Sequence, residues 1–253
     1  MVATFLPPFC SAEQVVPQVR ERGFAALAPE TLAGVCQLEL LDLHALAPQW
    51  ENLPPDQYLK DGGRYRQRRH SCFVVEAGQV LLAPHRAHWQ SLDYNALHGG
   101  MQRWFEPLPA VLLEQPVWTR LVAGLADLCS RLRPSPRWYV EAHQFRIDTA
   151  DGIGRPTPEG AHRDGVDFVA VALVNRLGIK GGETRVFAAA GPDGQRFTLA
   201  QPWSLMFLDD ERVIHESTPI QPLEEVGHRD TLVLTFRAAG FQGEGADPGP
   251  GDK

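Results

Sequence analysis

The second half of the chain contains seven short segments that are rich in β-branched and aromatic residues and are separated by Gly, Pro and Asp. In sequence order they read WYVEAHQFRI, VDFVAVALV, ETRVFAA, RFTLAQ, SLMFLDD, RVIHESTPI and DTLVLTFRA. Short strands that recur roughly every 8 to 12 residues, with turn-forming residues between them, are typical of an all-β sandwich or jelly roll. We therefore predict a jelly-roll core over residues 136–240.

The first half of the chain instead spaces its apolar residues as helices do. Residues 116–132 are the clearest case, because apolar residues at intervals of three and four share one face and a proline stands at the first turn. Residues 11–22 and 30–46 show weaker helical patterns. We expect a helix-rich part over residues 1–135 that packs on the jelly roll, which gives an α+β fold.

Two other regions fit neither pattern. Residues 58–98 are rich in Arg, His, Gln and aromatic residues, and β-branched runs at 73–75 and 80–82 predict short strands there. Residues 241–253 are rich in Gly, Pro and acidic residues, which predicts a flexible tail. We expect residues 1–240 to form a single domain.

The charge of the chain argues against nucleic acid as the main partner. The formal net charge is -7 and the sequence pI is about 5.7, so no overall basic field attracts a phosphate backbone. The one basic cluster, RYRQRRH at residues 64–70, is short and contains Tyr65 and Gln67. We interpret it as part of a loop on the substrate side.

Cysteine spacing and hydropathy indicate a cytoplasmic protein with no membrane partner. The four cysteines show no Cys-x-x-Cys spacing, which disfavours a zinc knuckle or a thioredoxin-like motif and suits reduced thiols. No stretch approaches the roughly 18 apolar residues of a membrane span. The N-terminal MVATFLPPFC has no basic residue before its short apolar run, unlike a signal peptide. The sequence does not indicate an oligomeric state.

A candidate metal site begins at the sequence His162-Arg163-Asp164. Residues i and i+2 of an extended chain point to the same face, so this histidine and this aspartate can bind one ion. His215 lies 53 positions later (215 minus 162) in another predicted strand and can supply a third ligand. Two imidazoles and one carboxylate form the facial triad of non-haem iron(II) oxygenases, which leaves positions open for a co-substrate and O2. We predict His162, Asp164 and His215 as the iron(II) ligands and catalytic residues.

The letters His-Arg-Asp occur again at residues 228–230, but no histidine follows them. Arg229 and Thr231 share one face of the predicted strand TLVLTFR, and a guanidinium matches both oxygens of a carboxylate. We predict that they bind the distal carboxylate of 2-oxoglutarate, the co-substrate of such oxygenases. Arg237 and Arg146 remain alternative anchors.

The segment EAHQFRI alternates between two faces. His143 shares one face with Phe145, and we assign it a supporting or core role. Gln144 and Arg146 share the other face, and we predict that they line the cofactor site.

Several motifs together resemble one enzyme family. AHRDG, KGGETRVF, SLMFLDDERVIHESTPI and GHRDTLVLTFR, with DQYLKDGGRYRQRRH, YNALHGGMQRWFEP and EAHQFRI upstream, resemble bacterial 2-oxoglutarate and iron(II)-dependent dioxygenases. That branch includes free L-isoleucine hydroxylases and a biofilm, stress and motility protein. The resemblance covers most of residues 20–240. It implies a double-stranded β-helix (jelly-roll) core, iron on His162, Asp164 and His215, and 2-oxoglutarate held by an arginine of the last core strand.

The resemblance also implies the reaction, which is hydroxylation of a small substrate with 2-oxoglutarate and O2. The nearest resemblance suggests a free aliphatic L-amino acid as that substrate. Oxidative decarboxylation of 2-oxoglutarate would give succinate, CO2 and a ferryl species that attacks a C–H bond. We hypothesise that Tyr65, Arg66, Arg68 and Gln90 belong to a lid that binds the polar end of the substrate.

Alternative functions would use the same residues. A zinc hydrolase would place a metal-bound water on the same triad. A regulatory jelly roll would bind 2-oxoglutarate as a signal without turnover. A cupin-like isomerase is disfavoured, because cupins usually place two histidines one residue apart and follow them with a glutamate. The histidines at positions 70, 85, 88 and 98 fit no fixed ligand spacing, so we expect structural roles for them.

Overall fold

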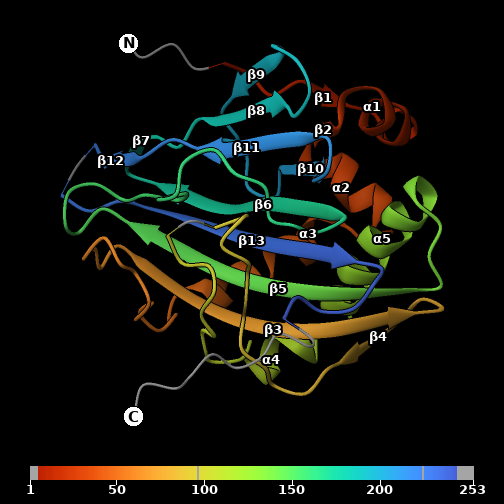
Figure 1. Ribbon diagram of the computed structural model, residues 1–253, viewed down its shortest axis with the longest axis horizontal. Helices are drawn as coiled ribbons and strands as arrows, with labels where there is room; N and C mark the ends of the chain where they lie inside the picture. Colours follow the sequence, from red (N-terminus) through yellow and green to blue (C-terminus); the bar gives the residue numbers. More distant parts are fainter. Residues whose placement is uncertain (1–4, 96, 224, 244–253) are drawn as a thin grey trace.

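An eight-stranded sheet forms the centre of the computed structural model, which describes residues 5–95, 97–223 and 225–243 (Figure 1). The strand order is β1-β2-β10-β6-β13-β5-β3-β4, and only the β1–β2 pair is parallel. In that order the strands span Phe9–Cys10, Phe24–Leu27, Leu205–Asp209, Phe168–Leu177, His228–Arg237, Arg137–Asp148, Arg66–Glu76 and Gln79–Leu82.

Two smaller sheets form a second layer over part of the large one. Their orders are β11-β8-β9 and β12-β7, and Figure 1 shows them together beyond β6. These strands span, from β7 to β12, Ile179–Gly181, Thr184–Ala188, Gly194–Phe197, Val213–Ser217 and Ile220–Pro222. Two layers of mostly antiparallel strands are the jelly-roll arrangement, so the predicted fold class is confirmed.

Alternate residues of the large sheet face two different cores, as the strand period of two requires. On β6 the even positions from 168 to 174 belong to the core that the helices cover. The odd positions 169, 171 and 173 belong to the core between the sheets. This alternation decides which side chains of every central strand can reach a cavity between the layers.

The helices cover one face of the large sheet, where α1, α2 and α5 share a core with it (Figure 1). The α-helices span Val15–Arg22, Pro29–Val35, Leu40–His44, Ala110–Leu113 and Pro116–Leu132, and 3-10 turns span Ala12–Gln14 and Ala47–Trp50. The helix α5 has the predicted bounds. Its Gly124 permits close packing, because a Cβ there would lie 2.7 Å from the Cα of Cys36. Among the described helices, none is long and apolar enough to cross a membrane.

The first half of the chain contributes more to the sheet than its pattern predicted. The short strand expected at residues 73–75 is the end of β3, an 11-residue strand that pairs with β5 along its whole length. The division between a helix-rich part and a jelly roll at residue 135 is therefore wrong in this respect. The strand β3 was missed because it begins RQRRH, and buried cationic strands are rare.

The first residues of the expected tail pack against the core. Phe241 is buried against Tyr139, with ring centroids 5.0 Å apart. Gln242 donates to the backbone carbonyls of Asp164 and Gly165 at 2.7 and 3.0 Å. The prediction of a flexible tail is therefore wrong for residues 241–243, and residues 244–253 lie outside the described part of the chain.

Candidate metal centre and its cavity

A short backbone bridge places two histidines side by side at one end of a cavity between the sheets. The amide N–H of His162 donates to the carbonyl of His215 at 3.0 Å, and the reverse bond measures 2.9 Å. Residues paired directly across antiparallel chains carry neighbouring side chains. The two imidazole centroids accordingly lie 4.6 Å apart.

Asp164 completes the group. Its Oδ1 lies 3.9 Å from Nε2 of His162, and its Oδ2 lies 3.7 Å from Nε2 of His215. One potential ligand atom from each of the three residues lies within 4.8 Å of the others. The structure thus brings together the three residues that the sequence predicted as metal ligands.

Asp210, which is fully buried, holds the backbone around Asp164. Its carboxylate accepts the amide N–H groups of Asp164, Gly165 and Val166 at 3.0, 2.8 and 3.1 Å. Three charge-assisted hydrogen bonds to consecutive amides fix this loop. Asp210 therefore controls where the Asp164 carboxylate lies.

The three side chains can supply the deprotonated ligand atoms that a divalent cation requires. Nδ1–H of His162 donates to the carbonyl of Gly160 at 2.9 Å, so Nε2 carries the lone pair that faces Asp164. Burial lowers the pKa of His215, which keeps that imidazole neutral. Burial raises the pKa of Asp164 to about 7. Burial opposes protonation of His162, but Asp164, Glu159 and the Gly160 carbonyl raise the pKa of His162 above its ordinary value. As two neutral imidazoles and one carboxylate, these groups would fit Fe(II) with positions left open.

Arg229 lies in the same cavity and is buried, at 4% exposure. Its Nε has no hydrogen-bond partner among the described residues. Burial and the nearby Arg176 lower the pKa of Arg229 to about 10, so an anion would stabilise its charge. Thr231 lines the cavity beside it on β13. Both residues line the cavity of the candidate metal ligands, and their role as a carboxylate anchor stays a prediction.

The other predicted co-substrate ligands face away from this cavity. Arg146 is paired with Asp230, with two hydrogen bonds of 2.7 Å, and Gln144 donates to the carbonyl of Gln49 at 3.3 Å. Neither side chain lines the cavity, because β5 turns its residues 141, 143, 145 and 147 inward. Arg237 bonds the carbonyl of Gly240 at the far end of β13. The assignment of Gln144 and Arg146 to the cofactor site is therefore corrected.

The arginines expected in a lid belong instead to the strand β3. Arg66 and Arg68 line the cavity, while Tyr65 does not and donates its hydroxyl to Asp61 at 2.6 Å. Nε of Arg66 donates to the buried Asp56 at 2.7 Å. The two arginines are thus a rigid wall of the cavity, and Tyr65 is removed from the predicted substrate contacts.

Aromatic rings fix the position of Arg68. Its guanidinium carbon lies 3.9 Å from the ring centroid of Phe105 and 4.4 Å from that of Phe145. Cation–π contacts of this kind hold a guanidinium in one plane.

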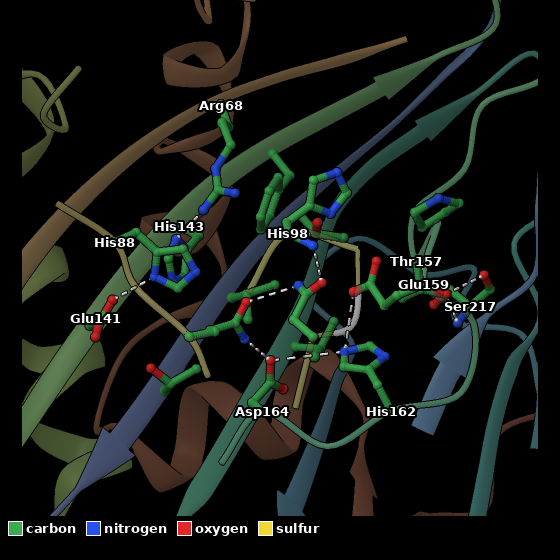
Figure 2. Close-up of a pocket in the computed structure, with 18 of the residues that line it drawn as sticks. Arg68, His88, His98, Glu141, His143, Thr157, Glu159, His162, Asp164 and Ser217 are labelled. Carbon is green, nitrogen blue, oxygen red and sulfur yellow. Dashed lines mark hydrogen bonds and ion pairs between the residues drawn. The ribbon is translucent and has the colours of Figure 1, made fainter. Parts of the chain in front are cut away.

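A second group of potential ligands consists of His70, His88, Glu141 and His143. His88, Glu141 and His143 line the other side of the cavity (Figure 2). Glu141 accepts from His70 and His88 at 2.9 and 2.8 Å. Burial opposes ionisation of Glu141, but these hydrogen bonds hold its pKa well below the ordinary value. Burial lowers the pKa of all three histidines, so the imidazoles are neutral.

The hydrogen bonds of this second group oppose metal binding. Arg68 can only donate, so Nδ1 of His143, 2.7 Å from Nη2 of Arg68, must accept. Nε2 of His143 then carries the proton and has no lone pair for a metal. We interpret the group as a hydrogen-bonded wall, which agrees with the structural roles expected for His70 and His88.

Sequence reasoning missed Asn95, Arg103, Glu141 and Glu159 as residues of this cavity and gave Gln90 a different role. Gln90, which was expected to contact substrate, donates to Oδ1 of Asp164 at 3.3 Å. Its own Oε1 accepts from Asn95 and Arg103, both at 3.0 Å. Glu159 also lines the cavity, and its Oε1 lies 3.6 Å from Nε2 of His162. Only the alternation of β5, which places Glu141 on the face of His143, was visible in the sequence.

Comparison with solved structures identifies close and distant relatives. A bsmA homologue from Methylobium petroleophilum PM1 is 52% identical with a TM-score of 0.89, covering 96% of this chain and 99% of that chain. IDO from Bacillus thuringiensis is 21% identical with a TM-score of 0.75, covering 91% and 100%. The Fe(II)/α-ketoglutarate-dependent dioxygenase TqaL is 16% identical with a TM-score of 0.69, covering 92% and 88%. The last two similarities show a common fold alone.

No curated protein sequence matches this chain. Residues 47–235 match the family described as 2OG-Fe dioxygenase, and this span contains the histidine–aspartate–histidine group, Arg229 and the wall of β3 and β5. The family implies Fe(II), 2-oxoglutarate and O2 as cofactor and co-substrates. The chain belongs to the 2-oxoglutarate- and iron(II)-dependent dioxygenase family.

Proposed function

We propose that this dioxygenase hydroxylates a free aliphatic L-amino acid, with Fe(II) bound by His162, Asp164 and His215 and with 2-oxoglutarate held by Arg229 and Thr231. The observation that carries the proposal is the convergence of two imidazole Nε2 atoms and one carboxylate within 4.8 Å, in the cavity that also contains the buried Arg229.

The overall reaction is balanced without any further reductant. Bound at this site, Fe(II) with 2-oxoglutarate and O2 supplies the oxidising power. One oxygen atom of O2 enters a C–H bond of the substrate, and the other enters succinate as CO2 is released. Of the four electrons that reduce O2, two come from the oxidative decarboxylation of 2-oxoglutarate and two from the C–H bond of the substrate.

The residues of the chain supply position and charge. Arg229 offers a guanidinium to the distal carboxylate of 2-oxoglutarate, which sets the orientation of that molecule. Asp210 holds the backbone N–H of Asp164, and Gln90 donates to Oδ1 of the Asp164 carboxylate, so together they orient it. Val171, Met206 and other apolar residues line the same cavity and exclude water from it.

The cavity lining favours a small amphipathic substrate. Apolar surface from Phe145, Ile147 and Val166 lies in the same cavity as several charged side chains. An aliphatic amino acid offers an apolar side chain and a charged end, so it matches both kinds of wall.

Spectroscopy and product analysis test this proposal. Anaerobic addition of Fe(II) and 2-oxoglutarate should give a visible charge-transfer band in the wild type that is lost in His215→Ala. Addition of O2 with a panel of aliphatic L-amino acids should then release succinate and a hydroxylated amino acid in equal amounts. No band in the folded wild type, or an undiminished band in His215→Ala, would refute the iron site. A band without succinate release would instead support a protein that binds 2-oxoglutarate as a signal.

A further inference from the structure

Arg103 and Glu159, which line the cavity, lack the ion-pair partners that the neighbouring arginines and Glu141 have. Among the described residues, Arg103 forms no ion pair, and Glu159 contacts neither an arginine nor a lysine within 4.0 Å. Arg103 is only 2% exposed, although it lines the cavity. The charges of Asp56, Glu159 and Glu141 act on Arg103 from a distance, but none of these carboxylates forms an ion pair with its guanidinium. A ligand bound between Arg103 and Glu159 would give each charge a direct partner.

The other charged groups on the β3 and β5 side of the cavity have their charges paired, although Nη2 of Arg66 and Nε of Arg68 also lack a hydrogen-bond partner among the described residues. Arg66 pairs with Asp56 at 2.7 Å, and Nη1 of Arg68 lies 3.9 Å from the same carboxylate. Glu141 is held by the imidazoles of the second group. Over the whole cavity and the Asp56 that pairs with its wall, the formal charges cancel, since the four arginines at positions 66, 68, 103 and 229 match the four carboxylates of Asp56, Glu141, Glu159 and Asp164. A ligand that is neutral overall but carries both charges matches it better than a simple acid or amine.

Both groups also present polar atoms that no protein group satisfies. Nη2 of Arg103 donates to Gln90, but its Nε has no hydrogen-bond partner among the described residues. Oε2 of Glu159 is buried and likewise has no partner in the described part of the chain. Buried polar atoms of this kind are uncommon in folded proteins and often mark a binding site. Burial and Arg66 lower the pKa of Arg103 to about 10, so an anion beside it would stabilise its charge.

Each of the two groups lies one contact from a proposed iron ligand. Arg103 reaches Asp164 through the side chain of Gln90. Glu159 lies directly beside His162, as Figure 2 shows. A molecule bound between them would lie next to the metal centre, with its remaining atoms free to extend over the apolar lining of the cavity.

We infer that Arg103 binds the carboxylate of the substrate and that Glu159 binds its ammonium group. The two residues would select zwitterionic α-amino acids over the corresponding acids and amines. This inference rests on the proposed function and assigns two recognition residues to it. Arg66 and Arg68, which the sequence favoured for this role, form the fixed wall behind Arg103.

Calorimetry of the anaerobic Fe(II)–2-oxoglutarate complex can test each assignment separately. The probes are L-isoleucine, L-leucine, L-valine and L-methionine, each compared with its primary amide and with its deaminated acid. The variants are Arg103→Gln, Arg103→Lys and Glu159→Gln. Matched controls are Arg69→Gln and Glu106→Gln, whose side chains form a partly exposed ion pair of 2.8 Å outside the cavity lining. The visible band, measured first, shows whether each variant still loads iron and 2-oxoglutarate.

The Arg103 and Glu159 variants should each weaken the binding of a different pair of probe classes. Arg103→Gln should weaken binding of the amino acids and the deaminated acids by about 10- to 100-fold and leave the amides unaffected, since one charged hydrogen-bond donor is lost. Arg103→Lys should weaken binding of the same probes less than Arg103→Gln does, because lysine keeps the positive charge. Glu159→Gln should weaken the amino acids and the amides by a similar factor and spare the deaminated acids. The two controls should match the wild type.

Several outcomes would overturn the inference while leaving the proposed function intact. Equal loss for all three probe classes would indicate a structural role. Loss of the visible band in Glu159→Gln would place Glu159 at the metal instead. Wild-type binding in both Gln variants, or no binding of any of the four amino acids to a wild type that forms the band, would also refute it. Absence of the band in the wild type would refute the proposed function itself.

Discussion

Replacing Asp210 by Asn should weaken iron binding although Asp210 touches no metal. The carboxylate accepts three backbone N–H groups, one through Oδ1 from Asp164 and two through Oδ2 from Gly165 and Val166. Asn offers one oxygen and one NH2 group. In its better orientation the oxygen keeps the two bonds to Gly165 and Val166, and the NH2 group faces the N–H of Asp164.

The loss can be estimated from these contacts. At least one charge-assisted hydrogen bond disappears, at about 1.5–3 kcal/mol, and a buried N–H group is left without an acceptor. For a chain of this size we expect the melting temperature to fall by about 5–10 °C. Because Asp164 loses its backbone support, Fe(II) affinity should fall by about 10- to 100-fold, the usual effect of removing a group that orients a metal ligand.

The assay is anaerobic titration of Fe(II) at saturating 2-oxoglutarate, with the visible band as the signal and thermal unfolding measured in parallel. Asp209→Asn is the control, because its carboxylate lies 3.8 Å from Arg133 and accepts no hydrogen bond from residues 164–166. The control should bind iron as the wild type does. Wild-type iron affinity in a folded Asp210→Asn variant would refute the role given to this loop.

Three further predictions concern the rest of the cavity and its supports. Arg229→Gln should raise the dissociation constant of 2-oxoglutarate by about 100-fold in the same titration, with little change in Fe(II) affinity; an unchanged constant would exclude Arg229 as the anchor. Arg146→Gln should leave 2-oxoglutarate binding unchanged but destabilise the fold by about 3 kcal/mol in denaturant unfolding, because the buried Asp230 loses its arginine partner. A defect in 2-oxoglutarate binding without loss of stability would contradict this. Burial, opposed by the hydrogen bond with Glu141, lowers the pKa of His88 from 6.5 to about 3. Between these pH values His88 binds up to one more proton in the unfolded chain than in the folded chain, so His88 alone should lower the stability by about 1 kcal/mol per pH unit below pH 6.5, and His88→Asn should show a correspondingly shallower slope.

The sequence predicted the strands and helices whose patterns are periodic. The helix α5 was found because its apolar residues recur at helical spacing and Pro116 marks its first turn. The strand β13 was found because apolar and polar residues alternate, which also placed Arg229 and Thr231 on one face. The His162–His215 bridge could not be seen in the sequence, but the residue types at the two positions were sufficient to nominate them.

The errors have a common physical cause. A period of two separates the faces of a strand but does not say which face meets a cavity. Gln144 and Arg146 were therefore assigned to the site, although the opposite face, with Glu141 and His143, lines it. Glu159 and Arg103 lie in loops with no period at all, so only the folded chain brings them to the metal centre.

We expect one cation to bind between His162, Asp164 and His215, with 2-oxoglutarate extending to Arg229. Anomalous diffraction from anaerobic crystals grown with Fe(II) and 2-oxoglutarate would locate the metal without reference to activity. We predict a single iron peak within coordination distance of those three side chains, and a co-substrate carboxylate against the Arg229 guanidinium. An iron peak among His70, His88 and Glu141 instead, or no peak at the predicted site in crystals that contain iron, would contradict it.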